Sequence, residues 1–226
     1  GKQQHRWTFL PGYGVRLPLR YEVHGIDVSH HNGVIDWPRL RAMQSAGVGV
    51  DFVYIKATEG ATHLDRRFSF NWQQAHLVGM PRGAYHFYNP RVWSADQAKH
   101  FIRQVKLRPG DLPPVLDIEI TGGKSKEIIV KGAKNWLKLI EAQYGLKPVV
   151  YTSEHFYKTY LYGELTDYPL WIAAYSKAEL DVPESGGKIL YWQHTDRGSV
   201  SGIKGKVDLN AFMGTRTEWL SLPRAR

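Results

Sequence analysis

Acidic side chains recur at the downstream ends of the apolar segments of this chain. They are Asp27, Glu59, Asp117 and Glu119, and a further one, Asp208, lies within the last apolar segment. In a barrel of alternating strands and helices, the carboxyl ends of the strands form the mouth that holds the active site. Carboxylates gathered there raise one another's pKa, and such groupings are more often catalytic than structural. The alternative for Asp27 and Asp208 is that they cap loops or pair with Arg or Lys.

Residues 116–119, Leu-Asp-Ile-Glu, have the most informative spacing. Alternation along a strand puts Asp117 and Glu119 on one face, roughly 6.6 Å apart at ~3.3 Å per residue. Two carboxylates beside apolar neighbours suit a glycosidase, which keeps one carboxyl protonated as an acid and another charged. A D-x-E pattern alone occurs by chance in many chains, so its position after an apolar strand carries this prediction.

Eight short apolar segments predict the strands that position these residues. They cover about residues 23–28, 52–57, 83–88, 114–119, 149–152, 170–175, 189–193 and 207–210. Each of the first five is followed by a helix pattern, over about residues 36–47, 64–78, 94–106, 126–144 and 154–162. The Gly-rich gaps after the sixth and seventh strands are too short for a helical crossover. The sequence therefore predicts the α/β class and an irregular, TIM-barrel-like β/α barrel of about eight strands and five helices.

The domain organisation follows from the same pattern. Residues 1–22 are basic and interrupted by Pro and Gly, which predicts an arm or linker, and residues 23–226 are predicted to form one catalytic domain. No apolar run reaches the ~18 to 20 residues that cross a bilayer. Because the chain begins without Met, an export signal or membrane anchor is expected upstream of it.

Composition narrows the classes of partner and site. The net charge of +9 favours nucleic acid, anionic lipid or an acidic cell wall as partner, or simply a basic surface kept for solubility. The absence of Cys excludes disulfides, thiolate metal sites and a Cys nucleophile. Ten His show no metal-ligand spacing, and the adjacent His30 and His31 are expected to point apart, so no metal or other cofactor is expected. Neither Ser29 nor Ser153 has the G-x-S-x-G elbow of a hydrolytic triad.

A series of short motifs carries a family resemblance. In order they are residues 25–30 (GIDVSH) with 35–37 (IDW), 56–60 (KATEG), 83–87 (GAYHF), 116–119 (LDIE), 150–153 (VYTS), 170–173 (LWIA), 192–193 (WQ) and 207–210 (VDLN). Together they resemble the motif series of glycoside hydrolase family 25, the Chalaropsis-type lysozymes, over about residues 24 to 213. The pair His31-Asn32 departs from the aromatic and Gln of many members.

The resemblance implies a five-helix barrel that cuts the β-1,4 bond between N-acetylmuramic acid and N-acetylglucosamine. It implies Glu119 as the catalytic acid and, as the other active-site carboxylates, Asp117, Asp27 and Asp208. The residues expected to bind substrate are Tyr85, Tyr151, Trp171, Gln193 and Glu59. The expected partner is peptidoglycan, with no nucleic acid and no stable membrane insertion, and the expected protein is a monomer in the periplasm, the envelope or the medium.

Two mechanisms and two rival functions stay open. The favoured mechanism is substrate-assisted: the 2-acetamido group attacks the anomeric carbon, Asp117 stabilises the oxazolinium, and the anomeric configuration is retained. The alternative uses Asp117, or another site Asp, as nucleophile or as base for a water. The rival functions are a catalytically inactive glycan-binding barrel and a nucleic-acid-binding domain. The latter predicts a basic stripe with interleaved aromatics, whereas here the aromatics lie on strands beside acids.

Overall fold

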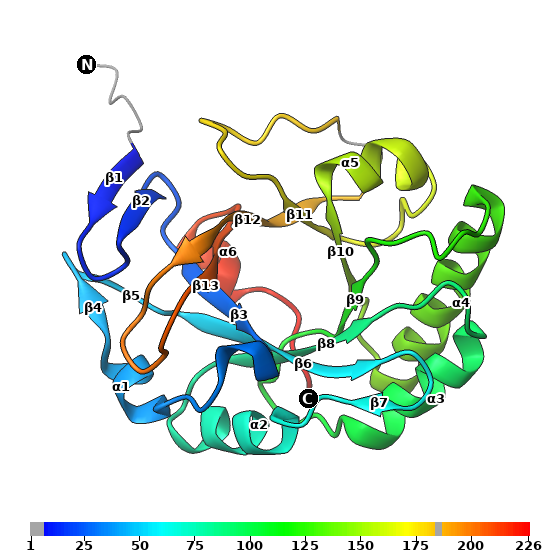
Figure 1. The fold of residues 1–226 in the computed structure, drawn as a ribbon, viewed down its shortest axis with the longest axis horizontal. Coiled ribbons are helices and arrows are strands. Elements are labelled where there is room, and N and C mark those ends of the chain that lie inside the picture. The colour runs from blue at the N-terminus through cyan, green and yellow to red at the C-terminus, as the bar shows by residue number, and fades with distance from the viewer. Residues whose placement is uncertain (1–6, 184–186) are drawn as a thin grey trace.

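Eight strands close into a mixed barrel in the computed structural model, which describes residues 7–183 and 187–226 (Figure 1). They are β3 (His24–Val28), β6 (Phe52–Glu59), β8 (Arg82–Phe87), β9 (Val115–Asp117), β10 (Val149–Ser153), β11 (Leu170–Ala173), β12 (Ile189–Gly198) and β13 (Val207–Phe212). Neighbours from β3 through β6, β8, β9, β10 and β11 to β12 are parallel, and β13 closes the ring antiparallel to both β12 and β3. The predicted α/β class and eight-stranded barrel are confirmed.

Helices cover only part of the barrel. They are α1 (Trp37–Ala42), α2 (Phe68–Leu77), α3 (Ser94–Gln104), α4 (Lys126–Tyr144), α5 (Glu154–Phe156) and α6 (Arg216–Leu220). The first five follow the first five barrel strands, as predicted, and α6 is an addition. α1 is shorter than predicted, because the chain turns at Met43 into a small hairpin of β4 (Gln44–Ser45) and β5 (Val48–Gly49). After α5 the chain continues in a π-helical turn, Tyr157–Leu161, and β7 (His63–Leu64) extends the sheet beside β6.

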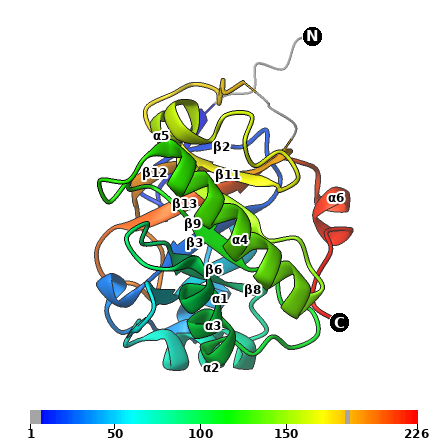
Figure 2. The ribbon, with the colours of Figure 1, turned by 90° about the vertical axis from the view of Figure 1, so that its right-hand side faces the viewer.

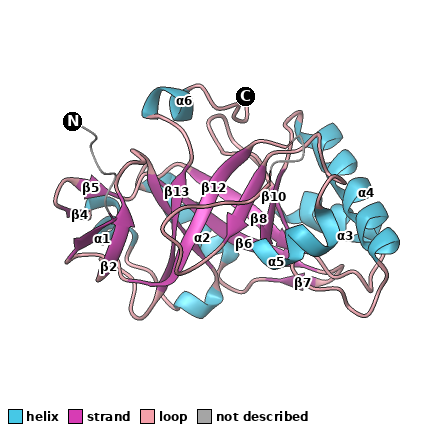
Figure 3. Cartoon of the chain, turned by 90° about the horizontal axis from the view of Figure 1, so that it is seen from above, coloured by secondary structure: helices cyan, strands magenta, loops and turns pink. Residues whose placement is uncertain are grey.

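A second hairpin occupies the predicted N-terminal arm. Residues 1–6 of that arm lie outside the described residues, and β1 (Trp7–Leu10) pairs antiparallel with β2 (Val15–Pro18). The side chains of Leu10, Tyr13 and Leu17 are buried in the main hydrophobic core. Figure 3 shows this hairpin with β4 and β5 on one flank of the barrel, opposite α3 and α4. Residues 7–18 are therefore packed against the barrel as a hairpin, and it is this strand pairing that the lack of periodicity did not predict.

Aromatic rings fill the barrel interior at the end away from the mouth, and polar groups line the mouth. Strand alternation points Phe52 and Tyr54 of β6 inward, where Tyr54 packs 5.1 Å from the ring of Trp171 and Phe52 packs 4.9 Å from that of Trp219. A Cβ at Gly83 would lie 2.1 Å from the Tyr54 ring, so glycine makes room for it. Because inward positions recur every second residue, the next inward position of β6, toward the mouth, belongs to Lys56.

The buried His194 makes the stability of this fold sensitive to acid. It lies on β12 under the N-terminal hairpin, with its ring 5.5 Å from that of Trp7, and neither ring nitrogen has a hydrogen-bond partner among the described residues. Burial lowers the pKa of His194 from 6.5 to about 3. The folded state therefore binds fewer protons than the unfolded state below pH 6.5, and stability falls as the pH drops from there toward 3.

We expect His194→Phe to remove part of this acid sensitivity. The contribution of one such group to the free energy of unfolding changes by at most about 1.4 kcal/mol per pH unit. Denaturant unfolding between pH 7 and pH 4 measures the slope, with the exposed His155→Phe as control. A variant that loses stability toward acid as steeply as wild type would show that His194 does not cause the effect.

Candidate active site at the barrel mouth

A pocket of about 120 Å³ opens at the carboxyl ends of the parallel strands. The residues that line it are Asp27, Tyr85, Val115, Asp117, Glu119, Tyr151, Trp171 and Asp208. Seven of the nine residues predicted for the site are in this lining. Gln193 joins them through a hydrogen bond to Asp27, and Glu59 lies outside the lining.

Asp27 and Asp208 form a carboxyl pair across two strands. The antiparallel register of β3 and β13 places them directly opposite each other. Burial, and then the neighbouring Asp27, raise the pKa of Asp208 to about 10. At neutral pH Asp208 therefore carries a proton.

Amide donors fix Asp27, the other member of this pair. Oδ2 of Asp27 accepts hydrogen bonds from Nε2 of Gln193 at 2.8 Å and from Nδ2 of Asn210 at 2.9 Å. The Trp171 indole, which can only donate, binds Oδ1 of Asn210 at 2.7 Å and so turns the NH₂ of Asn210 toward Asp27. The hydroxyls of Tyr151 and Tyr175 donate to Oε1 of Gln193 at 2.7 and 2.5 Å.

Asp117 and Glu119 form a second carboxyl pair with unequal exposure. Asp117 ends β9 and is 6% exposed, whereas Glu119, two residues beyond, is exposed to solvent. Burial, the Glu119 carboxylate and Asp27 raise the pKa of Asp117, and the charge of Lys56 opposes this. The pocket thus holds a buried carboxyl with a raised pKa beside an exposed one that substrate and water can reach.

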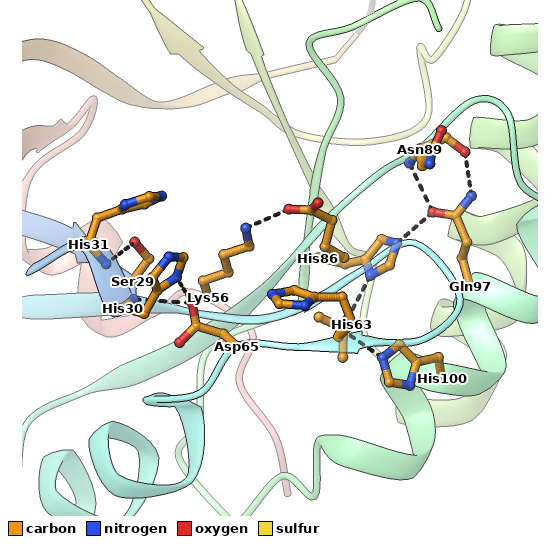
Figure 4. A network of polar contacts seen from close by, with 12 residues as sticks. Ser29, His30, His31, Lys56, His63, Asp65, His86, Asn89, Gln97 and His100 are labelled. Atoms are coloured by element: carbon orange, nitrogen blue, oxygen red, sulfur yellow. Dashed lines mark hydrogen bonds and ion pairs between the residues drawn. The ribbon is translucent and has the colours of Figure 1, made fainter. Parts of the chain in front are cut away.

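Lys56 places a cation beside this mouth and holds the predicted substrate-binding residue Glu59. The side chain is buried, and its Nζ donates to Oε1 of Glu59 at 2.7 Å and lies 5.4 Å from the centre of the Phe87 ring. Figure 4 shows Lys56 between His30 and His86 in the polar network beside the mouth.

His30 and His31 depart from the expectation that they point apart. Their rings lie 4.0 Å from each other, centre to centre. They share a 3₁₀ turn, His30–Asn32, capped by Ser29, and Oδ2 of Asp65 binds both the backbone N and the ring Nδ1 of His30 (Figure 4). This bond fixes His30 under His31. Within residues 7–183 and 187–226, no group of three or more His, Asp or Glu side chains is arranged to hold a metal ion.

Sequence reasoning missed three residues of this site: Lys56, Asn210 and Tyr175. Lys56 follows the inward-facing Tyr54 by two residues, so a charged residue at an inward strand position was the signal available. Asn210 lies two residues after Asp208 on the same strand. Tyr175 carried no such signal, because its contact with Gln193 arises from a loop beyond β11.

Comparison with known proteins gives one family and several relatives. The family model described as glycosyl hydrolases family 25 matches residues 26–203. The uncharacterized protein YegX of Escherichia coli (strain K12) is 42% identical over 216 residues, 95% of this chain and 79% of that protein. Lysozyme M1 of Streptomyces globisporus is 34% identical over 213 residues, 88% of this chain and 71% of the lysozyme. The solved structure of a family 25 glycosyl hydrolase from Bacillus anthracis matches with a TM-score of 0.80 and 31% identity, over 98% of this chain and 99% of that one.

Proposed function

We propose, from the premise that this chain belongs to family 25 of the glycosyl hydrolases, that it is a muramidase acting on peptidoglycan. The chain is a glycoside hydrolase. The bond that we assign to it is the β-1,4 linkage between N-acetylmuramic acid and N-acetylglucosamine. The observation that carries this proposal is the gathering of four carboxyl groups in one pocket: Asp27, Asp117, Glu119 and Asp208.

In the mechanism that we favour, the Asp117–Glu119 pair enters the reaction with one proton. Glu119, the exposed member, passes this proton to the glycosidic oxygen as the bond to the anomeric carbon breaks. The carbonyl oxygen of the muramic 2-acetamido group attacks that carbon and forms an oxazolinium. Asp117, now a carboxylate, accepts the acetamido N–H and stabilises the positive charge.

Water completes the reaction. Glu119 takes a proton from a water molecule that attacks the anomeric carbon, the oxazolinium opens, and the pair again holds one proton. Two displacements at the same carbon retain its configuration. In the alternative mechanism, Asp117 or another site Asp attacks the sugar directly or activates the water.

The remaining site residues support substrate and charge. Tyr85, Tyr151 and Trp171 line the pocket with rings that suit the apolar C–H faces of a sugar. Gln193 is 1% exposed, its Nε2 donates to Asp27 and its Oε1 accepts from two tyrosine hydroxyls, so we assign it to the positioning of Asp27 rather than to contact with the saccharide. Lys56 and Glu59 act as a pair at the rim.

The place of action follows from the substrate. Peptidoglycan lies outside the cytoplasmic membrane, so we expect the protein in the periplasm, the envelope or the medium. Among the residues that the structure describes, no helix combines the length and apolar character that a bilayer span requires.

Digestion of purified peptidoglycan tests the proposed function. We expect mass analysis of the soluble products to find muramic acid at every new reducing end, because hydrolysis leaves the anomeric carbon of that sugar free. New reducing ends on glucosamine would instead identify a glucosaminidase. Binding to the glycan without any product would support the inactive glycan-binding barrel.

A further inference from the structure

A groove of about 1450 Å³ lies outside the acidic pocket, between α3 and α4 and the loops that precede them. Figure 2 shows α3 and α4 side by side on this flank of the barrel. We call it the α3–α4 groove, and the residues that define it here are Tyr88, Arg91, Trp93, Lys131, Lys134 and Lys138. Nothing in the proposed reaction uses these side chains.

The groove shares the rim of the barrel mouth with the active site. Its two loops leave the carboxyl ends of the neighbouring strands β8 and β9, and the backbone N of Tyr88 donates to the carbonyl of Asp117 at 2.8 Å. Glu119 begins the loop that runs from the pocket to α4. A polymer chain held in the pocket is therefore within reach of the groove.

Close packing holds the walls of the groove in place. Gly122 has a φ of +58°, and a Cβ there would lie 2.8 Å from Cγ of Arg91, so the loop after β9 rests on the Arg91 side chain. Nδ2 of Asn135 on α4 donates to Oγ of Ser94 on α3 at 2.9 Å. A Cβ at Gly132 would lie 2.1 Å from the hydroxyl of Tyr88.

The groove has a surplus of positive charge. Its lining contains six Lys and Arg against three Asp and Glu: Arg91, Lys124, Lys126, Lys131, Lys134 and Lys138 against Asp96, Glu127 and Glu164. Glu164 forms an ion pair with Lys126, with 3.7 Å between Oε1 and Nζ. Lys131, Lys134 and Lys138 follow one another at spacings of three and four, which puts them on one face of α4. Within the described part of the chain, none of these three has a carboxylate within 4.0 Å.

Large apolar side chains accompany these cations. Trp93, at the start of α3, is 81% exposed, and Ile128, in the first turn of α4, is 53% exposed. An exposed indole beside unpaired ammonium groups suits a ligand that has both carboxylates and apolar segments. A neutral sugar chain could stack on the indole, but it has no carboxylate that would pair with the lysines.

We propose that the α3–α4 groove binds the carboxylate-bearing peptide stem attached to the muramic acid of the strand being cut. This inference rests on the proposed function, since that function puts a stem-bearing muramic acid in the pocket. The lysines pair with the stem carboxylates, and Trp93 covers its apolar side chains. An anionic bilayer is the less suitable partner, because a concave groove presents its cations to a chain rather than to a flat surface.

The triple variant Lys131→Gln/Lys134→Gln/Lys138→Gln tests the groove. We expect it to bind soluble glycan chains that carry peptide stems roughly tenfold more weakly than wild type, the loss that three exposed ion pairs give together. Its binding to chains stripped of stems by an amidase should not change. On stem-bearing chains KM should rise by the same factor, with kcat unchanged.

A second triple variant, Lys99→Gln/Lys106→Gln/Lys147→Gln, is the matched control. It removes the same charge at exposed positions outside the groove and should behave as wild type on both substrates. Equal losses on stem-bearing and stripped chains, or none, would overturn the proposal. So would a groove-dependent loss seen only with phosphatidylglycerol vesicles. Absence of turnover on both substrates would refute the proposed function, and the binding measurements would still decide on the groove.

Discussion

Glu119→Gln is expected to lower peptidoglycan cleavage by about 10² to 10⁴-fold, the usual contribution of a general acid. The amide keeps the shape and the hydrogen-bonding reach of the side chain and cannot deliver a proton to the glycosidic oxygen. Glu119 is exposed at the pocket, whereas its partner Asp117 is buried. Within the D-x-E segment, Glu119 is the only exposed acid beside the buried Asp117. A proton from Asp117 therefore has no other acid in this segment through which to reach the substrate.

Steady-state kinetics and oligosaccharide binding measure this effect together. Binding should survive, because the amide still forms hydrogen bonds, and circular dichroism checks the fold. Glu179→Gln, on an exposed side chain that pairs with Arg20 far along the chain, is the matched control and should cleave as wild type does. Turnover by Glu119→Gln close to that of wild type would remove Glu119 from its assigned role.

Peptidoglycan without its N-acetyl groups should be cut at least about 100-fold more slowly than the acetylated polymer. In the substrate-assisted mechanism the acetamido oxygen is the nucleophile. A nucleophile held in position within the substrate lowers the activation barrier substantially. A free amine at that carbon cannot form an oxazolinium. Wall stripped only of its peptide stems keeps the nucleophile and remains a substrate.

Asp117→Asn separates the two mechanisms further. A neutral amide in place of the carboxylate stabilises the oxazolinium poorly, so turnover on acetylated glycan should also fall strongly. The two mechanisms are compared by four rates: those of wild type and of this variant, each on acetylated and on de-N-acetylated chains. Rapid hydrolysis of fully de-N-acetylated glycan by wild type would favour direct attack by Asp117 or another site Asp.

Much of the barrel was predictable because its strands and helices are encoded locally. Each barrel strand is an apolar run with a regular inward period, and the longest helix runs over Lys126–Tyr144, the predicted bounds, with Ser125 as cap and Gly145 at its end. The N-terminal hairpin was not predicted, because Leu10, Tyr13 and Leu17 are buried by contacts with distant parts of the chain. The close contact between the rings of His30 and His31 depends in the same way on Asp65.

The residues of the candidate site also divide into those that local sequence predicts and those that depend on the folded barrel. Asp27, Asp117 and Glu119 were found because they lie near or just beyond the carboxyl ends of parallel strands, where a barrel gathers its functional groups. Asp208 reaches the same mouth from the amino end of β13, because that strand is antiparallel to β3. Asn210 was missed because its partners, Asp27 and Trp171, come from other strands of the closed barrel. Lys56 was missed although its ion-pair partner Glu59 is only three residues away and its inward strand position was a signal. The Asn210–Asp27 bond joins residues 183 positions apart. A sequence pattern describes the strand that carries such a side chain and leaves the partner unknown.

The antiparallel strand β13 has a consequence for the order in which this enzyme is made. Asp27 lies on the first barrel strand and the carboxyl opposite it, Asp208, on the last, so the ribosome delivers the two halves of the pair nearly a whole chain apart. A nascent chain that ends before Val207 has neither a closed wall nor the second carboxyl. A register slip of one residue in the closing strand would turn Asp208 away from the pocket. The active site can therefore form only after nearly the whole chain has been synthesised. It forms only if the barrel has closed in the correct register.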